Sequence, residues 1–250
     1  MITERHPRLK AHLESSKEEL RKLLLTRGSE RVVEAMMQIP RECFMPAHRL
    51  RQAYEDLAIP LNEDPQSFST ISQPGVVAEM TTLLDPQPTD NVAEIGTASG
   101  YQAAVLARLC GHVTSFEISP ILAASSSLRM AALAIENVDI VPGDFADLDH
   151  TSKFDKLIVT ASIFPSLNLP IIGLVKEGGI LVAPVGGIKG EITDCKMVKF
   201  RIGAGDTAIK ERVLENTYSF VPLEGRFGWG NFIRTYIRLF HDKFFQEQSK

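Results

Sequence analysis

Residues 91–101 read Asn-Val-Ala-Glu-Ile-Gly-Thr-Ala-Ser-Gly-Tyr, a short apolar strand that runs into a turn containing two glycines. Glycines in such a turn let the backbone approach a ligand, and the helix expected to follow offers unpaired N–H groups at its N-terminus. A strand, a glycine-containing turn and a helix in this order are typical of parallel α/β folds that bind a cofactor. The stretch therefore predicts the first strand of such a sheet and one wall of a site.

The residues that follow alternate between predicted helices and short apolar strands. Helices are expected over 101–108 and 121–135, with a short one near 169–175, and strands are expected over 113–117, 138–141, 156–160 and 180–184. This rhythm predicts a parallel sheet covered on both faces. Two longer amphipathic strands, about 194–201 and 210–221, should form an antiparallel hairpin at one edge. The fold class is therefore α/β, a doubly wound, mostly parallel seven-stranded sheet.

Helical additions are expected at both ends of this sheet. Ser16 and Glu19 form a capping-box pattern before an apolar helical face, and Ser29 can cap a second helix that ends at Pro40. Residues 61–70 are interpreted as an irregular surface loop. Residues 227–245 place aromatic and aliphatic side chains at helical spacing. We expect a helical segment over 1–60, a Rossmann-like domain over 61–225 and an amphipathic helix within 226–250.

Composition excludes several functional classes. The chain has 250 residues, 44% apolar and 23% charged, with a net charge of −4, which is typical of a soluble globular protein. The pI of about 5.9 gives no basic footprint for nucleic acid, and no apolar stretch approaches the ~20 residues that span a membrane. Three widely spaced cysteines predict reduced thiols in the cytoplasm, and six histidines without ligand spacing predict no metal site.

Carboxylates follow the predicted strands at the edge where a cofactor would bind. Glu94 precedes the glycine turn, Glu117 ends the next strand, where a carboxylate can hold a ribose diol, and Asp144 follows the third. A carboxylate beside the turn disfavours a pyrophosphate and suits a cation, such as the amino group of S-adenosyl-L-methionine. Plainer interpretations stay open: Glu117 and Asp144 can be solvated strand ends, and Ser72 can cap a helix that begins at Pro74.

Several motifs resemble the protein-L-isoaspartate O-methyltransferase family. The stretches Thr70-Ile-Ser-Gln-Pro74 and Glu94-Ile-Gly-Thr-Ala-Ser-Gly-Tyr-Gln102 carry the likeness most specifically. Further matches are Pro40–Phe44, Ala53–Asp56, Phe154–Ala161, Glu177–Gly186 and Phe220–Leu223. The resemblance runs from about residue 30 to residue 225, and it implies a class I S-adenosyl-L-methionine-dependent methyltransferase fold.

The resemblance also implies an activity. It is methyl transfer from S-adenosyl-L-methionine, giving S-adenosyl-L-homocysteine, to the free carboxylate of L-isoaspartyl residues in damaged proteins and peptides. The ester then collapses to a succinimide, whose hydrolysis regenerates some normal aspartate. An acceptor carboxylate is already ionised at pH 7, so alignment and exclusion of water should dominate catalysis and no strong base is needed.

Residue roles follow from the same resemblance. Ser72 matches the active-site hydroxyl and would hydrogen-bond the acceptor carboxylate. The expected cofactor contacts are Thr70 and Ile71 closing over the ligand; Glu94, Gly96, Thr97, Ser99 and Gly100 at its methionine end; Glu117 at the ribose; Asp144 and Phe145 at the adenine; and Thr160 and Ala161 at the end of the fourth strand. Val221, Pro222 and Leu223 would contact the peptide substrate. No partner other than the substrate is implied, and a monomer or homodimer is expected.

The chain departs from the family pattern at two places. Residues 62–69 are longer than the usual stretch, acidic and free of glycine, and Ala98 stands where a glycine is usual. Because the loop borders the substrate side, a second hypothesis is a carboxyl methyltransferase that acts on a normal Asp in a dedicated peptide. A third is a cofactor-binding adaptor that has lost catalysis.

Overall fold

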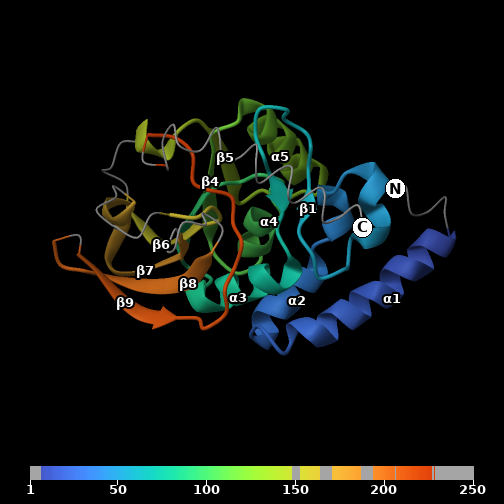
Figure 1. The fold of residues 1–250 in the computed structure, drawn as a ribbon, viewed down its shortest axis with the longest axis horizontal. Helices are drawn as coiled ribbons and strands as arrows, with labels where there is room; N and C mark the ends of the chain where they lie inside the picture. Colours follow the sequence, from blue (N-terminus) through green and yellow to red (C-terminus); the bar gives the residue numbers. More distant parts are fainter. Residues whose placement is uncertain are drawn as a thin grey trace.

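A computed structural model describes residues 7–147, 153–163, 171–186, 194–205, 207–226 and 228. The main strands are β3 (Asn91–Ile95), β4 (His112–Glu117), β5 (Val138–Pro142), β6 (Phe154–Val159), β7 (Val175–Gly186), β8 (Cys195–Gly203) and β9 (Thr207–Val213). They form one sheet in the order β5-β4-β3-β6-β7-β8-β9 (Figure 1). Strands β3 to β7 are parallel, whereas β8 is antiparallel to both of its neighbours. The predicted seven-stranded, mostly parallel sheet with a C-terminal antiparallel hairpin is confirmed.

Both faces of the sheet are buried. The helices are α1 (Pro7–Leu24), α2 (Glu30–Gln38), α3 (Pro74–Leu84), α4 (Tyr101–Ala107) and α5 (Pro120–Ala132). Side chains from these helices share one apolar cluster with Val92 of β3 and Ile158 of β6. The alternate residues of the same strands, Ala93 and Leu157, belong to a second cluster with the short 3-10 helix η5 (Ile172–Leu174). Alternation along each strand therefore feeds two cores, as a parallel sheet covered on both faces requires.

The N-terminal helices pack on the first of these clusters. Helix α1 begins at Pro7 rather than after Ser16, and the Ser16 hydroxyl donates to the backbone oxygen of His12 at 2.9 Å. The capping-box prediction is therefore wrong, because Ser16 lies inside the helix and bonds back to the preceding turn. Helix α2 lies where Ser29 predicted it, although the Ser29 side chain makes no capping hydrogen bond.

Two short strands bring the predicted 61–70 loop back upon itself. After the 3-10 helices η2 (Arg41–Phe44) and η3 (Ala47–Gln52), β1 (Ile59–Pro60) pairs antiparallel with β2 (Thr70–Ile71). The backbone N–H of Leu61 donates to the oxygen of Ser69 at 3.0 Å and continues this pairing. Residues 62–69 therefore form a closed loop whose two ends meet next to the start of α3.

The C-terminal strands differ from prediction at their ends. Strand β7 begins at Val175 rather than at residue 180, and its pairing with β6 is interrupted by a register shift between Phe154 and Lys156. Strand β9 ends at Val213, and it forms one edge of the described sheet with Ile209 58% and Val213 45% exposed. The predicted helix over 227–245 lies outside the described residues, except for Gly228.

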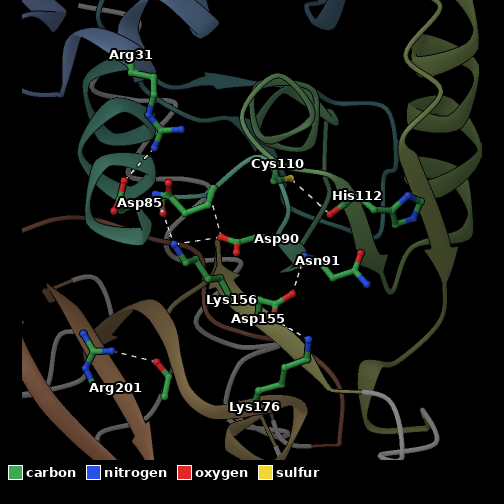
Figure 2. A network of polar contacts seen from close by, with 12 residues as sticks. Arg31, Asp85, Asp90, Asn91, Cys110, His112, Asp155, Lys156, Lys176 and Arg201 are labelled. Carbon is green, nitrogen blue, oxygen red and sulfur yellow. Dashed lines mark hydrogen bonds and ion pairs between the residues drawn. The ribbon is translucent and has the colours of Figure 1, made fainter.

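A polar network closes the amino ends of the central strands (Figure 2). Lys156 Nζ lies 3.1 Å from Asp90 Oδ2, and Asp155 accepts hydrogen bonds from Lys176 Nζ at 2.6 Å and from the backbone N–H of Asn91 at 2.9 Å. These contacts join β3, β6 and β7 at the end of the sheet that is remote from the carboxyl ends of the strands.

None of the helices in the described part of the chain has the length and apolar character that crossing a membrane requires.

Candidate active site

The carboxyl ends of β3, β4 and β6 open onto one cavity. It encloses about 930 Å³ of space between the atoms, a figure that includes solvent at its open mouth. The predicted residues that line it are Thr70, Ser72, Glu94, Gly96, Thr97, Ser99, Glu117, Asp144, Phe145, Thr160, Ala161, Val221, Pro222 and Leu223. Two predicted residues do not line it, Ile71 and Gly100.

The glycine turn after β3 has a backbone that only small residues tolerate. Gly96 has a φ of +98°, and a Cβ there would lie 2.5 Å from Thr160 Oγ1. Thr160 Oγ1 in turn donates to the backbone oxygen of Gly96 at 2.5 Å. Gly100 has a φ of +85° and faces Met130 of α5 instead of the cavity. Ala98 has a φ of +46°, a left-handed backbone conformation that is unfavourable for any residue with a Cβ atom.

Glu94 presents a buried carboxyl oxygen that has nothing to bond within the described residues. Its Oε2 accepts from the Ser115 hydroxyl at 2.6 Å, and Thr97 Oγ1 lies 2.6 Å from the same hydroxyl oxygen. Its Oε1 is buried without a hydrogen-bond partner in the described part of the chain. Burial raises the pKa of Glu94 to about 8, and the negative charge of Glu117 adds to this effect. A ligand cation would give Oε1 a partner and would favour the ionised carboxylate, as the amino group of S-adenosyl-L-methionine requires.

Glu117 and Asp144 are built into the cavity wall, so they are not solvated strand ends. Glu117 is buried and accepts from the backbone N–H of Ala98 at 2.7 Å and of Ser119 at 3.0 Å. Burial raises its pKa, and these N–H groups oppose the rise. Asp144 accepts from the backbone N–H groups of Ala146 at 3.0 Å and of Arg226 at 2.6 Å. Each carboxylate keeps lone pairs that a sugar or base could use.

Ser72 does not cap helix α3. The helix begins at Pro74 with Gln73 as its N-cap, and the Ser72 hydroxyl makes no hydrogen bond to any described residue. Its backbone oxygen, however, accepts from Arg41 Nη2 at 3.0 Å. The Ser72 side chain is therefore available to a ligand in the cavity, while its backbone is held from behind.

Arg41 does not line the cavity but supports it by holding the backbone of Ser72, and the local sequence did not predict this role. Its fully buried guanidinium also donates to the backbone oxygens of Ala53 at 2.6 Å and Leu57 at 3.2 Å, and it lies 5.7 Å from the centre of the Tyr101 ring. Burial lowers its pKa to about 10. The only sequence signal was its place within the Pro40–Phe44 stretch of the family resemblance, since nothing local marks a buried arginine.

The predicted peptide-contacting segment lies beside the end of β6. The backbone N–H of Ser162 donates to the oxygen of Val221 at 2.7 Å, and the N–H of Leu223 donates to the oxygen of Ser162 at 2.9 Å. Val221, Pro222 and Leu223 therefore form a short extended wall of the cavity next to Ala161. No group of three potential metal ligands occurs among the residues that the structure describes.

Several proteins with similar sequences share one description. The sequence profile of the protein-L-isoaspartate (D-aspartate) O-methyltransferase family matches residues 15–227. A protein-L-isoaspartate O-methyltransferase from Roseiflexus castenholzii is 40% identical over 210 residues, which cover 83% of this chain and 91% of that protein. One from Methanoregula boonei is 39% identical over 202 residues, covering 80% of this chain and 88% of that protein.

Solved structures agree with these sequence relatives. A protein-L-isoaspartate O-methyltransferase superposes with a TM-score of 0.75 at 26% identity, covering 85% of this chain and 67% of that one. A Plasmodium falciparum structure in complex with S-adenosyl-L-homocysteine has a TM-score of 0.65 at 20% identity, covering 82% of this chain and 97% of that one, and shows the shared fold. From its profile match and its relatives, the chain belongs to the protein-L-isoaspartate (D-aspartate) O-methyltransferase family.

Proposed function

We propose that this protein uses S-adenosyl-L-methionine to methylate the free carboxylate of L-isoaspartyl residues in damaged proteins and peptides. The methyl ester would start repair through a succinimide. One observation carries the proposal: among the described residues, neither Glu94 Oε1 nor the Ser72 hydroxyl has a hydrogen-bond partner, and both residues line the same cavity. The first suits a cationic cofactor and the second suits an anionic acceptor.

The residues in the cofactor half of the cavity support S-adenosyl-L-methionine as its ligand. Glu94 Oε1 would accept from the amino group, and the turn from Gly96 to Ser99 would contact the methionine end. Glu117 would bind the ribose, and Asp144 with Phe145 would bind the adenine. When bound, the cofactor supplies an electrophilic methyl group whose bond to sulfur breaks as the new bond to a carboxylate oxygen forms, leaving S-adenosyl-L-homocysteine.

The half of the cavity that would hold the acceptor carboxylate has to supply a hydrogen-bond donor rather than a general base. A carboxylate with a pKa of ~4 is ionised at pH 7, so no proton has to be removed. The Ser72 hydroxyl would donate to one carboxylate oxygen and orient the other toward the methyl group, with Arg41 fixing the Ser72 backbone. Val221–Leu223 would hold the peptide backbone, and the cavity walls would exclude water.

The acidic loop over residues 62–69 is compatible with an anionic substrate. Glu63 pairs with Arg129, and Asp64 accepts from the Ser119 hydroxyl, so both carboxylates turn toward α5. The loop residues that line the cavity are Ser67, Phe68 and Ser69, which are uncharged. This arrangement supports isoaspartate as the substrate over a dedicated peptide selected by loop charge.

We further propose a cytoplasmic enzyme that is a monomer or a homodimer, with residues 1–60 and 226–250 as additions to a catalytic domain over 61–225. In the part of the chain that the structure describes, no disulfide joins Cys43, Cys110 or Cys195, which supports a reducing compartment. Sedimentation of the pure protein would give its oligomeric state.

The direct test is incorporation of methyl label. The pure protein is incubated with methyl-labelled S-adenosyl-L-methionine and matched peptides containing isoaspartate or aspartate, and base-labile ester is counted. Ester on the isoaspartyl peptide alone, lost in Ser72→Ala and kept in the exposed control Ser127→Ala, supports the proposal. Ester on the aspartyl peptide alone favours the dedicated-substrate alternative. No ester on either peptide despite cofactor binding contradicts the proposal and leaves the adaptor alternative.

A further inference from the structure

The loop over residues 62–69 forms one wall of the cofactor cavity. Ser67, Phe68 and Ser69 line the cavity, together with Thr70 where the loop enters β2. The loop has no glycine and carries two adjacent carboxylates, Glu63 and Asp64. Exposed carboxylates would be expected on a surface loop, yet the Glu63 side chain is only 21% exposed and Asp64 is buried. Their contacts therefore require an explanation.

Both carboxylates bind helix α5. Glu63 Oε1 pairs with Arg129 Nη2, and Glu63 Oε2 accepts from the Ser125 hydroxyl at 2.7 Å. Asp64 Oδ2 accepts from the Ser119 hydroxyl at 2.6 Å. Ser119 is the N-cap of α5, and Arg129 lies near the other end of this helix. The loop is therefore fastened along the length of α5 at two separate points.

Arg129 and Ser119 also bind two residues that are expected to contact the cofactor, Ser99 and Glu117. Arg129 Nη1 donates to the oxygen of Ser99, in the glycine turn, at 3.2 Å. The backbone N–H of Ser119 donates to Glu117 Oε1 at 3.0 Å. Each anchor of the loop therefore touches a residue expected to contact the cofactor. Because the Arg129 side chain is only 17% exposed, its pairing with Glu63 is partly shielded from solvent.

We propose that Glu63 and Arg129, with Asp64 and Ser119, form a latch that holds the 62–69 loop against α5 and keeps the cofactor in its cavity. These four are positioning residues: they act through the loop wall, the Ser99 turn and Glu117. The latch sets how fast S-adenosyl-L-homocysteine and S-adenosyl-L-methionine leave. The proposal rests on the function proposed above, since it assigns the cavity to that cofactor.

The test measures release of the cofactor product from the full-length protein. Labelled S-adenosyl-L-homocysteine is bound, excess unlabelled ligand is added, and retained label is followed by rapid filtration. We expect Glu63→Gln to speed dissociation about tenfold, which corresponds to roughly 1.4 kcal/mol of lost restraint. The matched control is Glu211→Gln, which removes a carboxylate of similar exposure that pairs with Arg201 and Lys199 on β8. It should leave the dissociation rate unchanged.

A double-mutant cycle separates the latch from general damage. If the ion pair carries the effect, Glu63→Gln in an Arg129→Gln background should add little to the dissociation rate. Ser125→Ala removes one hydrogen bond to Glu63 and should give a smaller increase in a protein that melts normally. Additive effects in the cycle, or a Glu63→Gln rate equal to that of the wild type, would overturn the latch.

Hydrogen exchange keeps the two proposals distinguishable. In the protein without ligand, amides of residues 62–69 should be protected in the wild type and should exchange faster in Glu63→Gln, while β8 exchanges equally in both. Failure of the wild type to bind S-adenosyl-L-homocysteine would overturn the cofactor assignment. The exchange comparison would then still decide whether the contacts hold the loop closed.

Discussion

Replacing Glu94 by Gln should make the protein more stable at neutral pH and less able to bind its cofactor. Burial raises the pKa of Glu94 from 4.5 to about 8. Between those two values the unfolded chain has released the proton, whereas the folded protein retains it. The unfolded state then binds fewer protons than the folded state, so stability falls as the pH rises from 4.5 to 8.

The size of the effect follows from the same pKa values. Each pKa unit corresponds to 1.36 kcal/mol, so at pH 7 the ionisation of Glu94 in the unfolded chain lowers the free energy of unfolding by about 3 kcal/mol. Glutamine has nearly the same shape and no proton to lose, and its amide can still accept from Ser115. The variant should therefore lack this loss of stability, and the difference between its free energy of unfolding and that of the wild type should grow from pH 5 to pH 7.

Urea unfolding at pH 5, 6, 7 and 8 provides the assay, with the exposed Glu136→Gln as control. Calorimetric titration with S-adenosyl-L-homocysteine at pH 7 measures the second effect. We expect at least a tenfold loss of affinity, since a hydrogen bond to a charged group contributes about 1.5–3 kcal/mol. Parallel pH profiles for wild type and Glu94→Gln would refute the raised pKa. Unchanged affinity would refute the assignment of Oε1 to the ligand cation.

Three further predictions concern neighbouring features. Ala98→Gly should raise the free energy of unfolding by about 1 kcal/mol in urea, because it relieves a side chain held at a φ of +46°; a less stable variant would contradict this. Arg41→Lys should lower kcat about tenfold or more, because the Ser72 backbone loses the rigid guanidinium that holds it. The Kd for S-adenosyl-L-homocysteine should stay within twofold; equal losses of kcat and of affinity would point to misfolding instead. Lys156→Met should destabilise by about 1–3 kcal/mol in urea, because Asp90 loses its ion-pair partner and keeps, among the described residues, only the backbone N–H of Gln87 (Figure 2). Activity per folded molecule should be kept; lost activity would show that the network reaches the cavity.

Patterns within short stretches of sequence predicted most of the strands in the sheet. Alternating apolar strands and the Gly96–Gly100 turn predicted β3 to β6 and β8 within two residues of their observed ends. Helix α1 was placed too late because its first turns are largely polar, and a Ser-x-x-Glu spacing inside a helix is the same as that of a cap. The start of β7 was predicted too late because Gly178 and Gly179, a residue type that is uncommon in strands, lie inside it. These glycines fall where the pairing with β6 changes register.

The parts of the site that could not be predicted depend on distant partners. Glu63 and Asp64 read as surface residues because Arg129 and Ser119 stand 66 and 55 positions away in the chain. Arg41 is buried by backbone oxygens that come from 12, 16 and 31 positions further on. Such residues are polar by type and become interior only through tertiary contacts, which no local pattern records.

The exposed edge at β9 has a consequence for handling the protein in concentrated solution. An edge strand such as β9, which has no further neighbour in the described part of the sheet, can accept a strand from another molecule. The exposed side chains of Ile209 and Val213 would favour such a contact. Lys210, Glu211 and Arg212 stand between them, and their charges oppose that contact in dilute buffer. Salt screens those charges, so concentrated salt should promote edge-to-edge stacking of intact molecules at a place remote from the cofactor cavity. Low ionic strength is therefore the safer condition for storage and for crystal growth.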